Sequence, residues 1–211
     1  MVLAVVRGEL RPHDLLRLRD PMNIPSSAPD WVRASLARSE WVVVRRAKTQ
    51  FSRVAVGVRG PDRNQRWGTT VSVTEIIERV TPEQLAYRVD CQQPELPAMR
   101  ALQILRQRLQ TIPVRWGPTG SVGFELASGL SVIHCHSDVD IVVRFRRPAQ
   151  RRLLSRLHGE TQNLPARVDA QLDFDFGAVA LDELMSGAHD VLVKSSAGPM
   201  LMPADACWRR P

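Results

Sequence analysis

Two aspartates separated by a single residue, Asp138 and Asp140, open a run of β-branched residues, S-D-V-D-I-V-V-R, that is typical of a β-strand. Successive side chains of a strand point to opposite faces, so the spacing predicts both carboxylates on one face and Val139 and Ile141 on the other. Two carboxylates a few ångströms apart repel each other unless a cation lies between them. The pattern therefore predicts a Mg²⁺ site that faces the phosphates of a nucleotide-like substrate, in a transferase of phosphoryl or nucleotidyl groups.

The segments on either side of these aspartates show regular hydrophobic periodicity. A helix is expected over 98–110, with Leu102, Leu105 and Leu109 on one face, and a short strand over 112–116 leads to a turn at Gly120 and Ser121. A second helix is expected over 149–158. Residues 167–176 alternate like a half-buried strand. Its expected apolar face is Val168, Ala170, Leu172, Phe174 and Phe176, and its polar face is Asp169, Gln171, Asp173 and Asp175.

The sequence predicts an α/β (α+β) chain with a small N-terminal α+β domain over 1–90 and a second, mixed-sheet domain over 95–211. The two prolines in 91–97 make that stretch the candidate linker. The expected N-terminal elements are a first strand at the N-terminus, a helix over 31–39 capped by Asp30, strands over 41–47, 52–60 and 69–73, and helices over 74–80 and from Thr81. A helix over 180–187, a strand over 191–196 and an irregular tail are expected at the end of the chain.

Composition and charge narrow the function classes. The formal net charge of +7 over 211 residues favours an anionic partner, either a phosphate-rich substrate or an acidic protein. Nucleic acid binding receives little support, because Tyr87 is the only tyrosine and base stacking needs exposed aromatic rings. The three cysteines, Cys91, Cys135 and Cys207, form no C-x-x-C motif, which fits a reducing cytoplasm. No apolar run reaches the roughly 18 residues of a membrane span.

The Gly-Ser turn followed by S-D-V-D-I-V-V resembles the G-S…D-h-D-h signature (h, hydrophobic) of the polymerase β-type nucleotidyltransferase fold. In that fold a third carboxylate lies on a neighbouring strand, and R-V-D-A-Q-L matches its context. The resemblance therefore implies that Asp169 joins Asp138 and Asp140 as a metal ligand, with Asp173 on the same strand face as the competitor. It also implies that Gly120 and Ser121 hold a terminal phosphate through backbone N–H groups and the hydroxyl.

A longer block, R-W-G-P-T-G-S-V-G-F-E-L-A-S-G, is similar to the malonate decarboxylase holo-[acyl-carrier-protein] synthases, also called phosphoribosyl-dephospho-CoA transferases. Three further segments agree with that family: R-P-H-D-L-L, V-A-V-G-V-R-G and V-L-V-K-S-S-A-G-P. The resemblance implies Mg²⁺-dependent transfer from 2′-(5″-triphosphoribosyl)-3′-dephospho-CoA to a serine of the apo acyl-carrier subunit of malonate decarboxylase, with release of pyrophosphate. Lys194 would contact the triphosphate or pyrophosphate, and Arg115 and Arg144 are further candidates for that role.

Two other functions remain open from the sequence. One is an enzyme of the same fold with another acceptor, such as an adenylyltransferase, and the other is a non-catalytic basic module that binds a carrier subunit or nucleic acid. For two smaller patterns, a structural role competes with a functional one. His134-Cys135-His136 lacks a nearby second cluster that would complete a zinc site. His13-Asp14 is either a general-base pair or a local turn.

Overall fold

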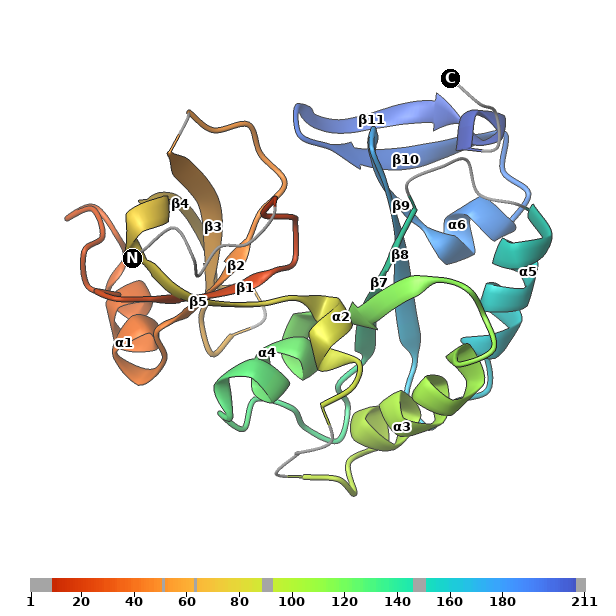
Figure 1. Cartoon of the computed structure of the whole chain (residues 1–211), viewed down its shortest axis with the longest axis horizontal. Helices are drawn as coiled ribbons and strands as arrows, with labels where there is room; N and C mark the ends of the chain where they lie inside the picture. The colour runs from red at the N-terminus through yellow and green to blue at the C-terminus, as the bar shows by residue number, and fades with distance from the viewer. Residues whose placement is uncertain (1–8, 51, 63, 89–92, 146–150, 208–211) are drawn as a thin grey trace. The chain divides into compact units, whose positions relative to one another are not determined.

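The computed structural model describes residues 9–50, 52–62, 64–88, 93–145 and 151–207 (Figure 1). The chain forms two compact units, residues 1–81 and residues 82–211, so the division lies ahead of the proline-containing stretch 91–97. The strand expected at the N-terminus falls on residues 1–8, outside the described residues, as does Cys91. Among the helices that the structure describes, none has the length and apolar character needed to cross a membrane.

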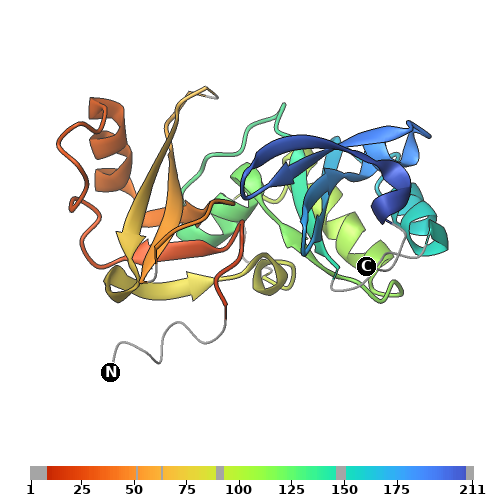
Figure 2. The same ribbon diagram turned by 90° about the horizontal axis from the view of Figure 1, so that it is seen from above.

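The first unit is an antiparallel five-stranded sheet with the strand order β4-β3-β2-β1-β5, and a helix packs against it (Figures 1 and 2). Its elements are β1 (Leu15–Leu18), α1 (Asp30–Arg38), β2 (Trp41–Val44), β3 (Arg53–Arg59), β4 (Arg66–Ser72), the 3₁₀ turn η2 (Val73–Glu75) and β5 (Ile76–Val80). The buried core includes Leu16, Leu18, Val32, Leu36, Val42, Val44, Val54, Val56, Val58, Val71 and Ile76. Alternate residues of β3 face this core, which fits the period of a strand.

Two local predictions for this unit were wrong. Residues 76–80 form a strand rather than a helix, because the β-branched Ile76 and Val80 are buried and the segment pairs with β1. Only the turn Val73–Glu75 is helical, and the Ser72 hydroxyl accepts a hydrogen bond from the Thr74 N–H there. Asp30 is the first residue of α1 rather than its cap; the cap position is Pro29, so Asp30 acts only as an acid in the first turn.

The second unit is a mixed six-stranded sheet with the order β11-β10-β9-β8-β7-β6, in which β7 and β8 are parallel and the other pairs antiparallel. Its elements are α2 (Pro82–Leu85), α3 (Pro97–Leu109), β6 (Arg115–Pro118), α4 (Gly120–Ser128), β7 (Val139–Arg144), α5 (Arg151–Glu160), β8 (Val168–Phe174), β9 (Gly177–Ala180), α6 (Leu181–Met185), β10 (Asp190–Ser195), β11 (Gly198–Pro203) and the 3₁₀ turn η3 (Ala204–Cys207). Figure 1 shows α3, α5 and α6 on one side of this sheet and α2 and α4 on the other. The predicted α+β class, with a mixed sheet in the second part, is confirmed.

The periodicity that identified α3 and β8 is confirmed by burial. Leu102, Leu105 and Leu109 are all buried, and β8 alternates buried and half-buried residues along its whole length. Phe176 was wrongly placed on the apolar face, because β8 ends at Phe174 and the chain turns back at Gly177. The Phe176 ring is 42% exposed and stacks on Phe174 with the ring centroids 5.0 Å apart.

The irregular tail that the sequence predicted is also wrong, because residues 198–203 form β11 and pair with β10 in six register positions. Proline has no N–H to donate, which usually argues against a strand. Pro199 and Pro203 are tolerated because β11 is the edge strand, where one side of the backbone needs no partner.

The reactivity of the Cys207 thiol tests whether the C-terminal turn η3 is buried. Its side chain is buried, and burial raises the pKa of the Cys207 thiol, with a further contribution from the Asp205 carboxylate. Since the thiolate is the reactive form, Cys207 should remain protonated at pH values near 8.5, where an ordinary thiol ionises. We expect alkylation of native protein at that pH to modify exposed Cys135 more than about tenfold faster than Cys207. Peptide mapping by mass spectrometry measures both rates, and equal rates would contradict the burial of η3.

Candidate active site

A pair of carboxylates lies at the centre of the second sheet. β7 and β8 run parallel, and Asp140 is the register partner of Asp169. Register partners on neighbouring strands lie about 4.8 Å apart and point to the same face. Both aspartates are half-buried, while Val139 and Ile141 on the opposite face of β7 are fully buried. The structure therefore brings Asp140 and Asp169 together.

Asp138 lies just outside this pair. β7 begins at Val139, whose N–H donates to the Arg167 carbonyl 2.9 Å away, so Asp138 is the last residue of the preceding loop. The alternation of burial nevertheless continues to Asp138, which is half-buried like Asp140, whereas Val139 between them is buried. Within the described part of the chain, no group of three or more His, Cys, Asp or Glu side chains is already arranged to hold a metal ion. The structure offers a pair of carboxylates with Asp138 two residues earlier along the chain.

The first turn of α4 lies against Asp140. Gly120 has φ +58°, in the left-handed region, and a Cβ atom placed on it would collide with the Asp140 carboxylate. The Thr119 N–H donates to the Asp140 carbonyl at 2.8 Å, which fixes the start of the helix to β7. Ser121, which follows Gly120, is buried. The first N–H groups of a helix lack intrahelical partners, so this end of α4 favours an anion beside the carboxylates.

Sequence reasoning missed Glu125, which holds the loop that ends at Asp138. Glu125 is 3% exposed, and its Oε2 atom accepts hydrogen bonds from the N–H groups of Val132 (2.8 Å) and Ile133 (2.9 Å). The remaining oxygen, Oε1, is buried and has no hydrogen-bond partner among the described residues. The sequence feature that could have identified Glu125 is its position as the one acid in the otherwise apolar segment G-S-V-G-F-E-L-A. An acid there must be bonded, because burial of an unpaired carboxylate is costly.

Removing this acceptor should loosen the loop. We expect Glu125→Ala to lower the free energy of unfolding by about 2–4 kcal/mol, because two N–H groups lose their acceptor. Glu125→Gln keeps one acceptor oxygen and should cost much less. Thermal unfolding followed by circular dichroism separates the two variants, and equal losses would mean that these two hydrogen bonds contribute nothing.

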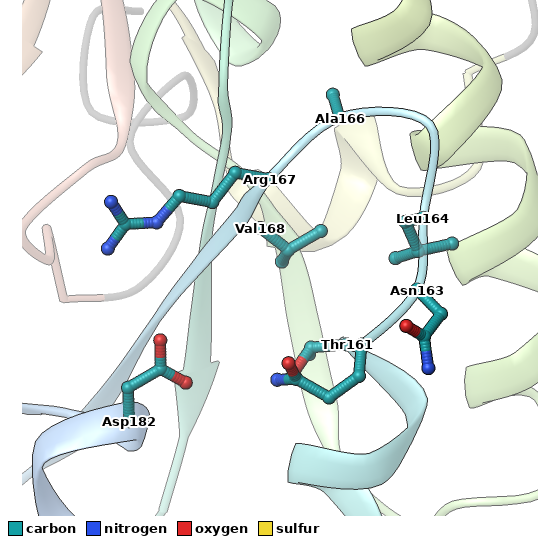
Figure 3. A pocket seen from close by; sticks show the side chains of 8 residues that line it. Thr161, Asn163, Leu164, Ala166, Arg167, Val168 and Asp182 are labelled. Atoms are coloured by element: carbon teal, nitrogen blue, oxygen red, sulfur yellow. The ribbon is translucent and has the colours of Figure 1, made fainter.

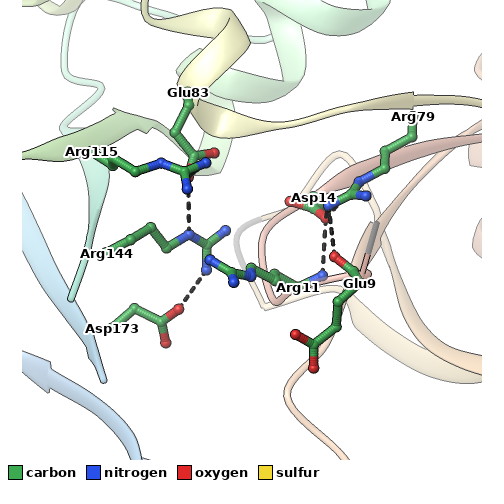
Figure 4. Close-up of polar contacts among 8 residues, drawn as sticks. All are labelled: Glu9, Arg11, Asp14, Arg79, Glu83, Arg115, Arg144 and Asp173. Atoms are coloured by element: carbon green, nitrogen blue, oxygen red, sulfur yellow. Dashed lines mark hydrogen bonds and ion pairs between the residues drawn. The ribbon is translucent and has the colours of Figure 1, made fainter. Parts of the chain in front are cut away.

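Asp173, the alternative third carboxylate, is engaged elsewhere (Figure 4). Its Oδ2 atom accepts a hydrogen bond from Nη1 of buried Arg144 at 2.5 Å, and Arg144 Nε lies 3.5 Å from Glu83 Oε1 on α2. Glu83 also faces Arg115 at 3.7 Å. Asp173 is four residues beyond Asp169 along β8, or about 13 Å. Asp169 is therefore the carboxylate beside Asp140, whereas Asp173 and Glu83 hold Arg144 between them.

Lys194 is exposed on β10 and is not beside the carboxylate pair. Lys194 pairs in register with Ala178, and Ala178 pairs with Asp173. Register partners share a face, so Lys194 lies on the face that carries the carboxylates. The offset of two strands and four residues places its Cα about 16 Å from that of Asp169.

The smaller sequence patterns have structural explanations. Asp14 is 1% exposed and accepts hydrogen bonds from the Arg11 N–H at 2.9 Å and from Arg79 Nε at 2.9 Å (Figure 4). This buried ion pair joins the start of β1 to β5, which favours the structural explanation of His13-Asp14. The rings of His134 and His136 lie 6.4 Å apart in the exposed loop before Asp138.

A pocket of about 200 Å³ lies beside the loop that connects α5 to β8 (Figure 3). It is lined by Thr161, Gln162, Asn163, Leu164, Ala166, Arg167, Val168 and Asp182. Val168 precedes Asp169 on β8, so its side chain points to the opposite face of the sheet. Arg167, two residues before Asp169, also lines the pocket, so the pocket lies at the start of β8.

Comparison with known proteins gives one family over nearly the whole chain. The model described as phosphoribosyl-dephospho-CoA transferase MdcG N-terminal domain matches residues 11–82, and the corresponding C-terminal domain matches residues 84–205. A phosphoribosyl-dephospho-CoA transferase of Pseudomonas aeruginosa is 44% identical over 203 residues, covering 96% of each chain. Proteins of the same name from Pseudomonas putida and Azotobacter vinelandii are 43% and 39% identical, over 91% of this chain and 93% and 92% of their own. No solved structure matches the chain.

Proposed function

Because the chain belongs to the phosphoribosyl-dephospho-CoA transferase family, we propose that it transfers this group from the triphosphoribosyl donor to a serine of the apo acyl-carrier subunit of malonate decarboxylase. Transferase activity follows from the family, and the acceptor is our proposal. The observation that carries the proposal is the Asp140–Asp169 pair beside the first turn of α4. That arrangement provides carboxylates for a cation next to N–H groups for a phosphate.

The carboxylate pair fits Mg²⁺. Mg²⁺ is usually bound through one or two carboxylates, with water and substrate phosphates as its remaining ligands, so a pair is sufficient. We assign Asp140 and Asp169 as protein ligands, with Asp138 at the end of the adjoining loop as the third. When bound, Mg²⁺ would neutralise the triphosphate and promote attack by the acceptor hydroxyl.

The chain's own groups orient the donor. The N–H groups at Gly120 and Ser121 would hold a phosphate against the carboxylates, and the rigid start of α4 fixes its direction. The serine oxygen then forms a bond to the α-phosphorus, the bond to pyrophosphate breaks, and the hydroxyl proton passes to solvent. Lys194 is an exposed cation on the same face, which supports a contact with the donor's phosphates.

The test is direct observation of the product. Purified protein is incubated with apo acyl-carrier subunit, the triphosphoribosyl donor and Mg²⁺, and the carrier is analysed by intact mass and peptide mapping. We expect the mass of one prosthetic group on a serine, with one pyrophosphate released for each carrier modified. Label transferred from ATP instead would identify an adenylyltransferase, and the absence of any Mg²⁺-dependent mass change would overturn the proposal.

A further inference from the structure

The segment between α4 and β7 ends at Asp138, and its residues 130–138, all of which the structure describes, contain no helix or strand. Ile133 and Ser137 within it are buried. Where such a segment is buried, its backbone N–H groups must find partners outside a regular ladder. The position of Asp138 therefore depends on the contacts that hold residues 130–138, which we call the Asp138 loop.

Glu125 on α4 supplies contacts at the start of this loop. Its carbonyl accepts a hydrogen bond from the Gly129 N–H at 2.8 Å, where the helix ends. Its Oε2 atom accepts from the N–H groups of Val132 and Ile133 at 2.8 and 2.9 Å. Glu125 thus binds the chain at the end of α4 through its backbone and again inside the loop through its side chain.

A turn from His134 to Ser137 fixes the rest of the loop. The His134 N–H donates to Ser137 Oγ at 3.0 Å, and the Ser137 N–H donates back to the His134 carbonyl at 3.0 Å. The Val139 N–H then donates to the Arg167 carbonyl at 2.9 Å, where β7 begins. Asp138 lies between that turn and β7, so a shift of the loop would carry the Asp138 carboxylate with it.

The same helix is fixed to the carboxylate pair at its other end. The Thr119 N–H donates to the Asp140 carbonyl at 2.8 Å, and Gly120 lies against the Asp140 carboxylate. Glu125 follows Gly120 by five residues, or about 7.5 Å along a helix axis. Because α4 contacts Asp140 at one end and the Asp138 loop at the other, a rigid element sets the spacing between the two aspartates.

Holding the loop in this way costs stability. The Oε1 atom of Glu125 is buried without a hydrogen-bond partner among the described residues, and an unpaired polar atom is costly to bury. Departures of this kind from stable packing are typical of functional sites. We propose that Glu125 is a positioning residue, which places the Asp138 carboxylate beside Asp140 and Asp169 and thereby sets the affinity for the divalent metal. The inference rests on the metal site of the proposed function.

Two substitutions separate geometry from charge. Glu125→Gln removes the charge but keeps an oxygen where Oε2 accepts two N–H groups. Glu125→Asp keeps the charge but is one methylene shorter, so its oxygens withdraw from Val132 and Ile133. With the donor present, we expect Mn²⁺ binding to weaken roughly tenfold in Glu125→Asp and to stay within about threefold of wild type in Glu125→Gln. The opposite order would mean that the charge of Glu125 attracts the cation, and it would overturn the proposal.

A double-mutant cycle shows whether Glu125 acts through Asp138. Asp138→Ala alone should weaken Mn²⁺ binding, and adding Glu125→Asp to it should weaken binding no further. Losses that multiply would mean that the two residues act independently, contrary to the proposal. Leu157→Ala is the control for lost stability, because Leu157 is fully buried on α5, on the other side of the sheet from α4 (Figure 1). It should lower the melting temperature without changing the Mn²⁺ affinity.

Kinetics and hydrogen exchange give two further readouts. The Mg²⁺ concentration for half-maximal transfer should rise roughly tenfold in Glu125→Asp, with kcat at saturating Mg²⁺ within about threefold of wild type. Amide exchange of residues 130–138, measured by mass spectrometry without metal or donor, should be faster in Glu125→Asp but not in Glu125→Gln. Unchanged exchange in Glu125→Asp would overturn the role of Glu125.

The outcomes distinguish this inference from the proposed function. Wild type that bound no Mn²⁺ would refute the metal site, and this inference with it. Wild type that bound Mn²⁺ and modified the carrier, with equal Mn²⁺ affinity in both Glu125 variants, would refute the positioning role of Glu125 alone.

Discussion

Replacement of Asp140 by asparagine is expected to lower kcat by about three orders of magnitude while the protein stays folded. The substitution preserves the shape of the side chain but removes one of two adjacent negative charges, so the site would lose affinity for a divalent cation. Asp169→Asn should have the same effect. Transfer to the carrier under single-turnover conditions measures the loss, and a circular-dichroism melt checks the fold.

Asp175→Asn is the matched control, because Asp175 is exposed and lies just past the end of β8. It makes the same chemical change on the same segment and should leave kcat within about twofold of wild type. If Asp140→Asn retained wild-type kcat, the carboxylate pair would have no part in the reaction.

Replacement of Gly120 by alanine is expected to lower kcat about 100-fold. Alanine at φ +58° costs about 1–2 kcal/mol, and its Cβ atom would collide with the Asp140 carboxylate. Relief of that collision must turn the Asp140 carboxylate or move the start of α4 away from β7. Either displacement separates the groups that would hold the metal and the phosphate.

Gly187→Ala isolates the collision from the backbone strain. Gly187 has φ +82°, but a Cβ atom there meets nothing within 4 Å. The Gly187→Ala variant carries only the backbone strain. Its melting temperature should therefore fall, while kcat stays unchanged. Equal kcat values for Gly120→Ala and Gly187→Ala would show that the contact between Gly120 and Asp140 does not matter for transfer.

The elements that carry the carboxylates follow from local patterns in the sequence. Leucine spacing identified α3, and alternation identified β8 as far as Phe174. The wrong predictions arose where tertiary pairing decides the outcome. Residues 76–80 become a strand because β1 offers them an edge, and residues 198–203 become β11 because β10 does the same.

The composition of the site was only partly predictable. The parallel register that places Asp169, and not Asp173, beside Asp140 depends on the packing of β7 against β8. No residue pattern reveals that Asp173 pairs with Arg144, or that Glu125 bonds to the loop before Asp138. Those contacts join residues seven or more positions apart, and only the folded chain brings them together.

Metal binding in the presence of the donor tests the central claim most directly. Mn²⁺, a paramagnetic substitute for Mg²⁺, is titrated into wild type, Asp169→Asn and Asp175→Asn with the triphosphoribosyl donor present, and bound ion is measured by electron paramagnetic resonance. We predict one tightly bound Mn²⁺ per chain in wild type and Asp175→Asn, and at least about tenfold weaker binding in Asp169→Asn. Equal Mn²⁺ affinity in all three proteins would contradict a metal site at Asp140 and Asp169.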